Sequence, residues 1–73
     1  METIRIDLPR NDVGQLLEGV DVLIDQWEAT TEYLRTGEVR EDVCIRESHD
    51  PHEAETITQI YRDLKRSIAD QLV

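Results

Sequence analysis

The sequence lacks several features that would place it in a specialised class. It contains one cysteine, Cys44, so it can form neither an internal disulfide nor a multi-cysteine zinc site, which fits a reducing compartment. No apolar run approaches the roughly 18 residues that a membrane span needs, and no basic-then-apolar leader opens the chain. We therefore predict a cytoplasmic protein with no membrane partner.

Positive charge is also scarce. The 73 residues include seventeen acidic and only eight basic side chains, which gives a formal net charge of −9 at pH 7. A chain this acidic repels the phosphates of nucleic acids and anionic lipids, so we expect no nucleic-acid partner. There is no Phe, and a domain of this size buries only about 60% of its unfolded surface, so any core is small.

A short alternating pattern opens the part of the sequence that does carry a structural signal. Ile4, Ile6 and Leu8 alternate with polar residues, which is typical of a half-buried strand. Pro9 ends the pattern. We predict an extended arm over residues 1–9 that contains this short strand.

The strongest pattern predicts a helix over residues 10–36. Apolar residues recur every seven positions in two interleaved series, and a third series widens the same stripe. This is the broad apolar face of a helix in a bundle rather than the narrow seam of a two-stranded coil. Gly37 follows as a stop, because glycine adopts the left-handed conformation of a C-cap. The stripe comprises Val13, Leu16, Leu17, Val20, Leu23, Ile24, Trp27, Thr30, Thr31 and Leu34.

A connector over residues 37–49 leads to a second predicted helix over residues 50–72. Within the connector, Val43 and Ile45 give a weak second strand signal. Asp50 is placed to cap the helix, Pro51 suits its first position, and Glu53 can reach back to the cap.

These elements predict an all-α fold, an antiparallel two-helix hairpin with a short N-terminal extended or strand segment, in a single domain over residues 1–73. Two helices cannot enclose a stripe as wide as that of residues 10–36, so we expect a homodimer that completes a four-helix bundle. Seven or eight extended residues reach about 25 Å, less than the roughly 40 Å of the first helix. The two strand segments should therefore pair between chains, if at all, and otherwise pack as extended arms.

An acidic face runs along the predicted first helix, within about a quarter of its circumference at roughly 100° per residue. It is open to three interpretations. It is a solvated surface, or it pairs with Arg62, Lys65 and Arg66 on the second helix, or it binds a basic partner or mimics the phosphates of a nucleic-acid duplex. Its members are Glu18, Asp21, Asp25, Glu28 and Glu32.

A third side of the same helix is uncharged along its length, although one third of the chain is charged. Depletion of charge around an aromatic residue is typical of a contact surface, although scattered surface residues would give the same pattern. We predict an oligomer or partner contact through Val22, Gln26, Ala29 and Tyr33, with Trp27 and Leu34 in the shared core.

The residues around the second helix start include the only cluster of metal-ligand types. Cys44, His49 and His52 lie among acidic residues, and such ligands suit zinc or nickel. The helix cap explains the acidic members, so we expect no metal, with His49 and His52 as weak candidates. We interpret Cys44 as an inert thiol that is at least half-buried.

No hydrolase elbow, phosphate-binding glycine loop or dinucleotide motif occurs, so we expect no enzyme activity and no cofactor. The preferred function is a small acidic oligomerisation or protein-interaction module. The first alternative is an acidic inhibitor or nucleic-acid mimic that binds a basic partner. The second is a metal-binding subunit that uses the connector histidines.

Overall fold

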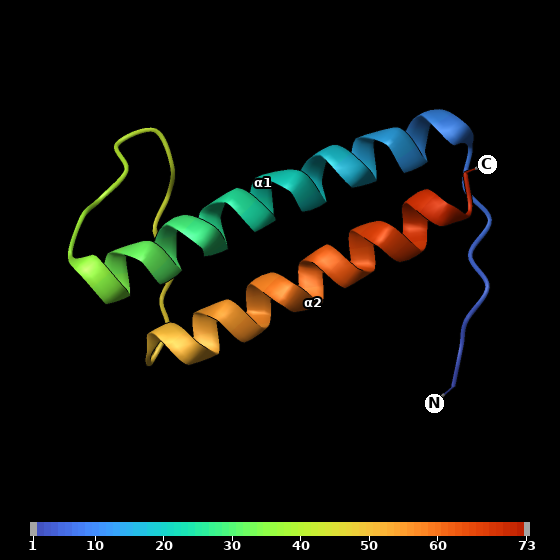
Figure 1. Ribbon diagram of the computed structural model, residues 1–73. Coiled ribbons are helices and arrows are strands. Elements are labelled where there is room, and N and C mark those ends of the chain that lie inside the picture. The colour runs from blue at the N-terminus through green and yellow to red at the C-terminus, as the bar shows by residue number, and fades with distance from the viewer. Residues whose placement is uncertain (1, 73) are drawn as a thin grey trace.

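The computed structural model describes residues 2–72, in which two α-helices lie side by side (Figure 1). These are α1 (Arg10–Thr36) and α2 (Pro51–Asp70). The prediction of an all-α hairpin is confirmed, and α1 has the predicted bounds, whereas α2 ends two residues before the predicted 72. Met1 and Val73, at the ends of the predicted single domain, lie outside the described residues.

Both predicted boundaries of α1 depend on backbone geometry. Pro9 precedes the helix without a side-chain cap, and its carbonyl accepts a hydrogen bond from the Val13 N–H at 3.1 Å. Gly37 has a φ of 80°, and its N–H donates to the Tyr33 carbonyl at 2.8 Å. This left-handed residue satisfies a carbonyl of the last turn and ends the helix, as predicted.

The start of α2 is a side-chain cap. The Glu53 N–H donates to the Asp50 carboxylate at 2.7 Å, which confirms the predicted cap, and Pro51 occupies the first turn. The Glu53 carboxylate reaches back one residue further than predicted, because it accepts from the His49 N–H at 3.4 Å and from the Ser48 hydroxyl at 3.0 Å. One orphan donor of the first turn, the Glu53 N–H, is thereby satisfied, and the Glu53 carboxylate also binds a backbone N–H just before the cap.

The core lies toward the connector end of the hairpin. Val20, Ile24 and Trp27 of α1 are buried, whereas α2 contributes only the small residues Ala54 and Thr58 to the fully shielded region. A helix that buries an alanine and a threonine lets the backbones approach closely but shields little of its neighbour's width. The core of one chain is therefore short.

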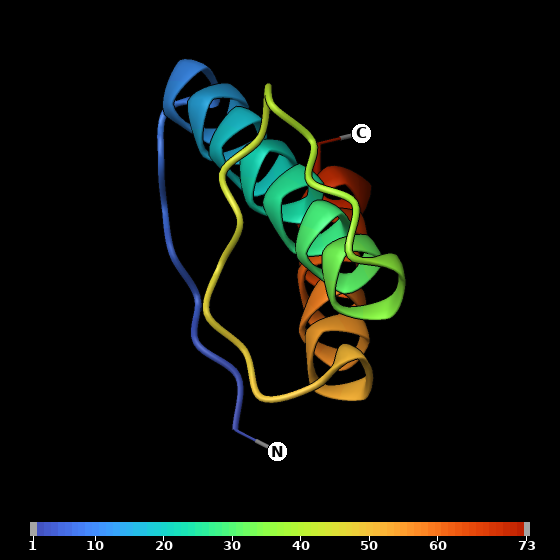
Figure 2. The same cartoon turned by 90° about the vertical axis from the view of Figure 1, so that its left-hand side faces the viewer.

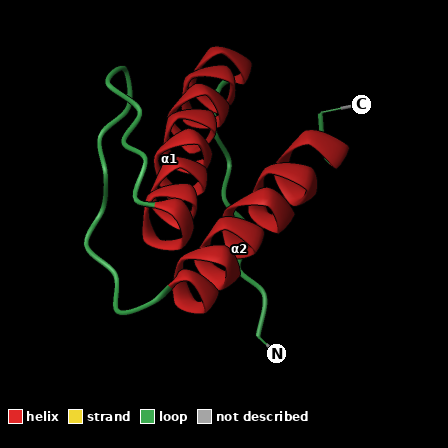
Figure 3. Cartoon of the chain, turned by 60° about the vertical axis from the view of Figure 1, so that its left-hand side comes forward, coloured by secondary structure: helices red, strands yellow, loops and turns green. Residues whose placement is uncertain are grey.

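The connector folds back along α1 instead of spanning the helix ends directly (Figure 3). The Arg46 N–H donates to the Thr30 hydroxyl at 2.8 Å, and that hydroxyl donates to the Gln26 carbonyl at 2.8 Å. The Arg46 guanidinium also donates to the side-chain oxygen of Gln26 at 3.2 Å. Thr30, which is fully buried, thus fastens the connector to the helix.

Residues 2–9 form an arm without regular secondary structure, and no strand occurs anywhere in residues 2–72. The strands predicted over residues 3–8 and 43–45 are not formed within one chain, because a strand needs a neighbour. Figure 1 shows the reason: the arm leaves one end of the hairpin and the connector lies at the other. Near the arm, the Arg10 guanidinium donates to the Leu72 carbonyl at 3.4 Å.

We expect Thr30→Val to lower the free energy of unfolding by about 1–2 kcal/mol, because it leaves the Arg46 N–H without its acceptor. Amide hydrogen exchange at Arg46 should also become faster. Thr56→Val is the matched control: its exposed hydroxyl bonds only to the His52 carbonyl of its own helix, and its cost should stay within about 0.5 kcal/mol. Equal effects of the two variants in denaturant unfolding would contradict the fastening role.

Candidate functional site

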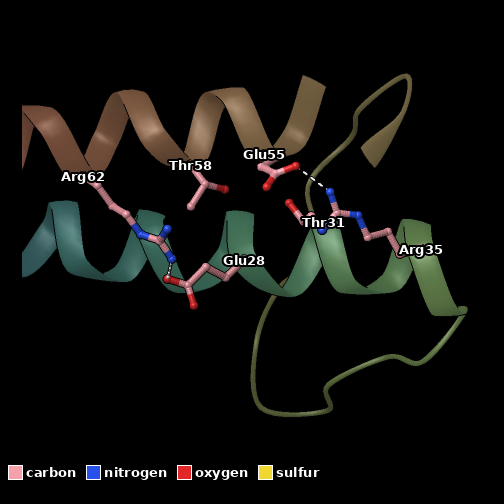
Figure 4. A pocket seen from close by; sticks show the side chains of 6 residues that line it. All are labelled: Glu28, Thr31, Arg35, Glu55, Thr58 and Arg62. Atoms are coloured by element: carbon pink, nitrogen blue, oxygen red, sulfur yellow. Dashed lines mark hydrogen bonds and ion pairs between the residues drawn. The ribbon is translucent and has the colours of Figure 1, made fainter. Parts of the chain in front are cut away.

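One edge of the helix pair is held by ion pairs, and Figure 4 shows two of them. Their side chains are between 40 and 59% exposed, so each pair contributes about 0–1 kcal/mol and serves mainly to set the register of the helices. Of the three interpretations of the acidic face, pairing with the second helix holds for Asp21 and Glu28, whereas Arg66 has no ion pair within residues 2–72. The pairs are Asp21–Lys65, Glu28–Arg62 and Arg35–Glu55, at 2.6, 2.5 and 2.5 Å.

A surface depression lies between these ion pairs, with Thr31 and Thr58 at its base (Figure 4). Both hydroxyls donate to carbonyls of their own helices, Thr31 to Trp27 at 2.9 Å and Thr58 to Ala54 at 2.8 Å. No buried side-chain nitrogen or oxygen in the described chain lacks a partner. The two hydroxyl groups at the base of the depression therefore already donate within their own helices.

The rest of the acidic face points to solvent. Glu18, Asp25 and Glu32 are exposed, and none of them forms an ion pair with another residue of the 2–72 segment. They lie on the side of α1 turned away from the apolar stripe, so their negative charges are not neutralised by α2.

The uncharged side of α1 is divided by contacts within the chain. Val22 and Tyr33 are exposed, as a contact surface requires. Gln26 is half-buried against Arg46, and Ala29 is fully buried, so it has no surface left for a second protein to touch. The four predicted contact residues thus do not form one continuous outer surface. Of the residues predicted for a shared core, Trp27 is buried within one chain and Leu34 is half-buried.

The edge opposite the ion pairs is apolar and open. On α1, helical geometry places Leu16 and Leu23 on the side of the stripe opposite the residues that form ion pairs. On α2, it places Ile60 and Leu64 on the side opposite Arg62. Leu16, Ile60 and Leu64 are 46, 58 and 43% exposed. We call this surface, formed by Leu16, Leu23, Ile57, Ile60 and Leu64, the apolar edge.

The apolar edge lies between two extended segments. At one end the connector crosses it, with Arg46 against Thr30 and Ser48 against Glu53. At the other end the arm begins. Figure 2 shows the arm and the connector on the same side of the helix pair. The sequence pattern placed Leu16 and Leu23 within the apolar stripe of residues 10–36, and the excess width of that stripe was the only signal of this edge.

The connector histidines do not gather ligands. His49 and His52 are both exposed, and the shallow pocket beside them is lined by His49 with Glu47, Ser48 and Glu53, without His52. Within residues 2–72, no group of three or more His, Cys, Asp or Glu side chains is placed to hold a metal ion. Cys44 is exposed, so the prediction of an at least half-buried thiol is wrong, because the connector loops outward before it meets α1.

Neither helix combines the length and the apolar character needed to cross a membrane, as far as the described residues extend. Comparisons with models of known protein families, with curated proteins and with solved structures gave no match. The apolar edge and the acidic face are therefore the features from which a function has to be argued.

We expect Arg62→Met to lower the free energy of unfolding by less than about 1 kcal/mol, since its ion pair with Glu28 is half-exposed. Arg66→Met removes the same charge from a residue outside the ion pairs and is the control. Urea unfolding of both variants in low and high salt checks this, and the difference between them should shrink as salt screens the pair. A loss above about 2 kcal/mol would mean that the pair holds the hairpin together.

Proposed function

We propose that this chain is a small, non-enzymatic oligomerisation module that acts as a homodimer, in which two hairpins pack apolar edge against apolar edge to form a four-helix bundle. The observation that carries the proposal is the apolar edge itself. Three large aliphatic side chains, Leu16, Ile60 and Leu64, remain about half-exposed on the edge opposite the ion pairs, in a chain whose core contains few large residues. A second copy brings the same surface and shields both.

The energetics favour such a pairing. Completing the burial of a Leu or Ile side chain that is half-exposed contributes about 1 kcal/mol, half of the value for full burial. Two copies contribute six such side chains from Leu16, Ile60 and Leu64. A two-fold dimer uses the same patch on both partners, so a self-complementary apolar strip is the expected form of the interface.

Charge does not oppose this arrangement as strongly as the net value of −9 suggests. The acidic face of α1 lies on the side of the helix away from the apolar edge, and its acids at Asp21 and Glu28 are paired with α2. Packing through the apolar edge keeps the unpaired acids at the outside, where water and salt screen them.

We expect light scattering at several micromolar concentrations to give a dimer mass for the unaltered chain and a monomer mass for Leu64→Asp, because a buried charge without a partner is costly at an apolar interface. Val22→Asp is the matched control, since Val22 is a similarly exposed aliphatic residue on the uncharged side of α1.

The other outcomes of the light-scattering experiment would relocate the interface or exclude the dimer. Loss of the dimer with Val22→Asp and its persistence with Leu64→Asp would move the interface to the uncharged side of α1. A cooperative monomer for the unaltered chain at all concentrations would exclude the module as proposed.

A second candidate function has one observation in its favour. Glu18, Asp25 and Glu32 form an exposed acidic row without ion pairs in the described chain, which suits an inhibitor or nucleic-acid mimic that binds a basic partner. Such binding would be strongly salt-dependent, because it would be electrostatic in origin.

A polylysine peptide probes this candidate. If the acidic row is a built surface, Asp25→Asn with Glu32→Gln should weaken binding more than tenfold at low salt. Glu38→Gln with Glu41→Gln alters the net charge equally but outside the row, and should weaken binding much less. Equal losses for the two double variants, measured by titration calorimetry, would show a response to net charge alone and remove this candidate.

A further inference from the structure

Two extended segments of this chain have backbone groups without partners. Within residues 2–72, neither residues 3–8 nor Cys44 and Ile45 take part in a backbone-to-backbone hydrogen bond. Both segments are short alternating sequences, and such an edge is a template for pairing with another strand. What they lack is a neighbour.

The arm has an apolar side and a polar side. Ile4 and Ile6 are 82 and 73% exposed, and Leu8 lies on the same side because side chains alternate along an extended chain. On the other side the Arg5 guanidinium forms an ion pair with Asp7 at 3.2 Å. The arm therefore has the pattern of a strand with one apolar face, and the described residues of its own chain leave Ile4 and Ile6 largely uncovered.

The two segments cannot meet over their length within one chain. The connector returns along α1 to the level of Gln26 and Thr30, where Arg46 is held. From Arg10 to that level is about 24–30 Å at 1.5 Å per residue. Eight extended residues reach about 26 Å, so only the tip of the arm would arrive.

In an antiparallel dimer centred on the apolar edge, the distance between the arm of one copy and the connector of the second copy becomes short. The α1 members of the apolar edge are Leu16 and Leu23, and their midpoint lies about 14 Å from the start of the arm at Arg10 and about 10–16 Å from the level where the connector is held. When the midpoints of two copies coincide, the arm of one copy begins at about the level of the connector of the second copy, within reach of eight extended residues. Figure 2 shows the arm and the connector on the same side of the helix pair, and the connector contacts Thr30, which lies on the same side of α1 as Leu23. Both segments therefore face the second copy.

We propose that the arm of each copy adds as a strand to residues 43–45 of the second copy, so that the dimer exchanges its arms reciprocally. This inference rests on the proposed homodimer and specifies which backbone segments hold the two copies together. Strand addition satisfies the free backbone groups of the arm and of Cys44 and Ile45, whereas the Val43 N–H already donates to the Arg40 carbonyl at 3.4 Å. It places the apolar side of the arm beside Val43 and Ile45. It also places Cys44 on the same face as the polar residues of the arm.

That last consequence turns the single cysteine of the chain into a probe. Cysteines substituted at Thr3, Arg5 and Asp7 lie on the same strand face as Cys44, whereas Ile6→Cys lies on the opposite face. The Cα atoms of directly opposed residues in neighbouring strands lie about 4.5–5.5 Å apart, within the Cα–Cα range for a disulfide. Each variant is oxidised with diamide at micromolar concentration, followed on non-reducing gels, and the linked peptides are identified by mass spectrometry.

We expect at least one of Thr3→Cys, Arg5→Cys and Asp7→Cys to form a covalent dimer linked to Cys44 at least tenfold faster than Ile6→Cys. The unaltered chain gives the background rate of Cys44-to-Cys44 linkage. If no polar-side variant exceeds Ile6→Cys, or if the bond forms within a single chain, the arm exchange is wrong.

Light scattering on the same reduced variants separates this inference from the proposed function. A dimer mass without arm-to-connector linkage would overturn the arm exchange and leave the homodimer standing. A monomer mass for the unaltered reduced chain would overturn both.

Discussion

α1 carries an apolar stripe that spans a wider arc than one packed helix shields, and this mismatch governs how the chain is built. α2 meets the stripe with the small side chains of Ala54 and Thr58, which permits close packing but covers only its middle. On one margin, half-exposed ion pairs close the gap. On the other margin the connector covers the end near Thr30 and leaves the apolar edge open. The two margins of the hairpin are thus chemically opposite.

Local signals predicted the helices well. Gly37 ended α1, and Asp50 with Pro51 started α2, because capping depends on residues only a few positions apart. The pairing of the acidic face with the second helix was one of three interpretations of the sequence, because helical periodicity alone does not determine which charges oppose each other across a hairpin. The helix ends, by contrast, depend only on residues close together in the sequence.

The course of the connector did not follow from the sequence. It depends on the Thr30 hydroxyl, which reads as one more member of the stripe but accepts a hydrogen bond from Arg46, sixteen residues away. That contact draws the connector onto α1 and makes Gln26 half-buried, while Ala29 lies fully buried on the side predicted as an outer surface. Periodicity assigns residues to a face of a helix, but it does not reveal which face a loop occupies. The position of the apolar edge follows from what the loop leaves uncovered.

The far side of α1, where Glu18, Asp25 and Glu32 face water, has a consequence for stoichiometry. In the proposed dimer these acidic residues would lie on the outward flanks of both copies, so the two outer surfaces would carry like charge. A third copy that approaches either flank would meet electrostatic repulsion. The charge distribution would therefore oppose growth of the proposed dimer into a larger assembly.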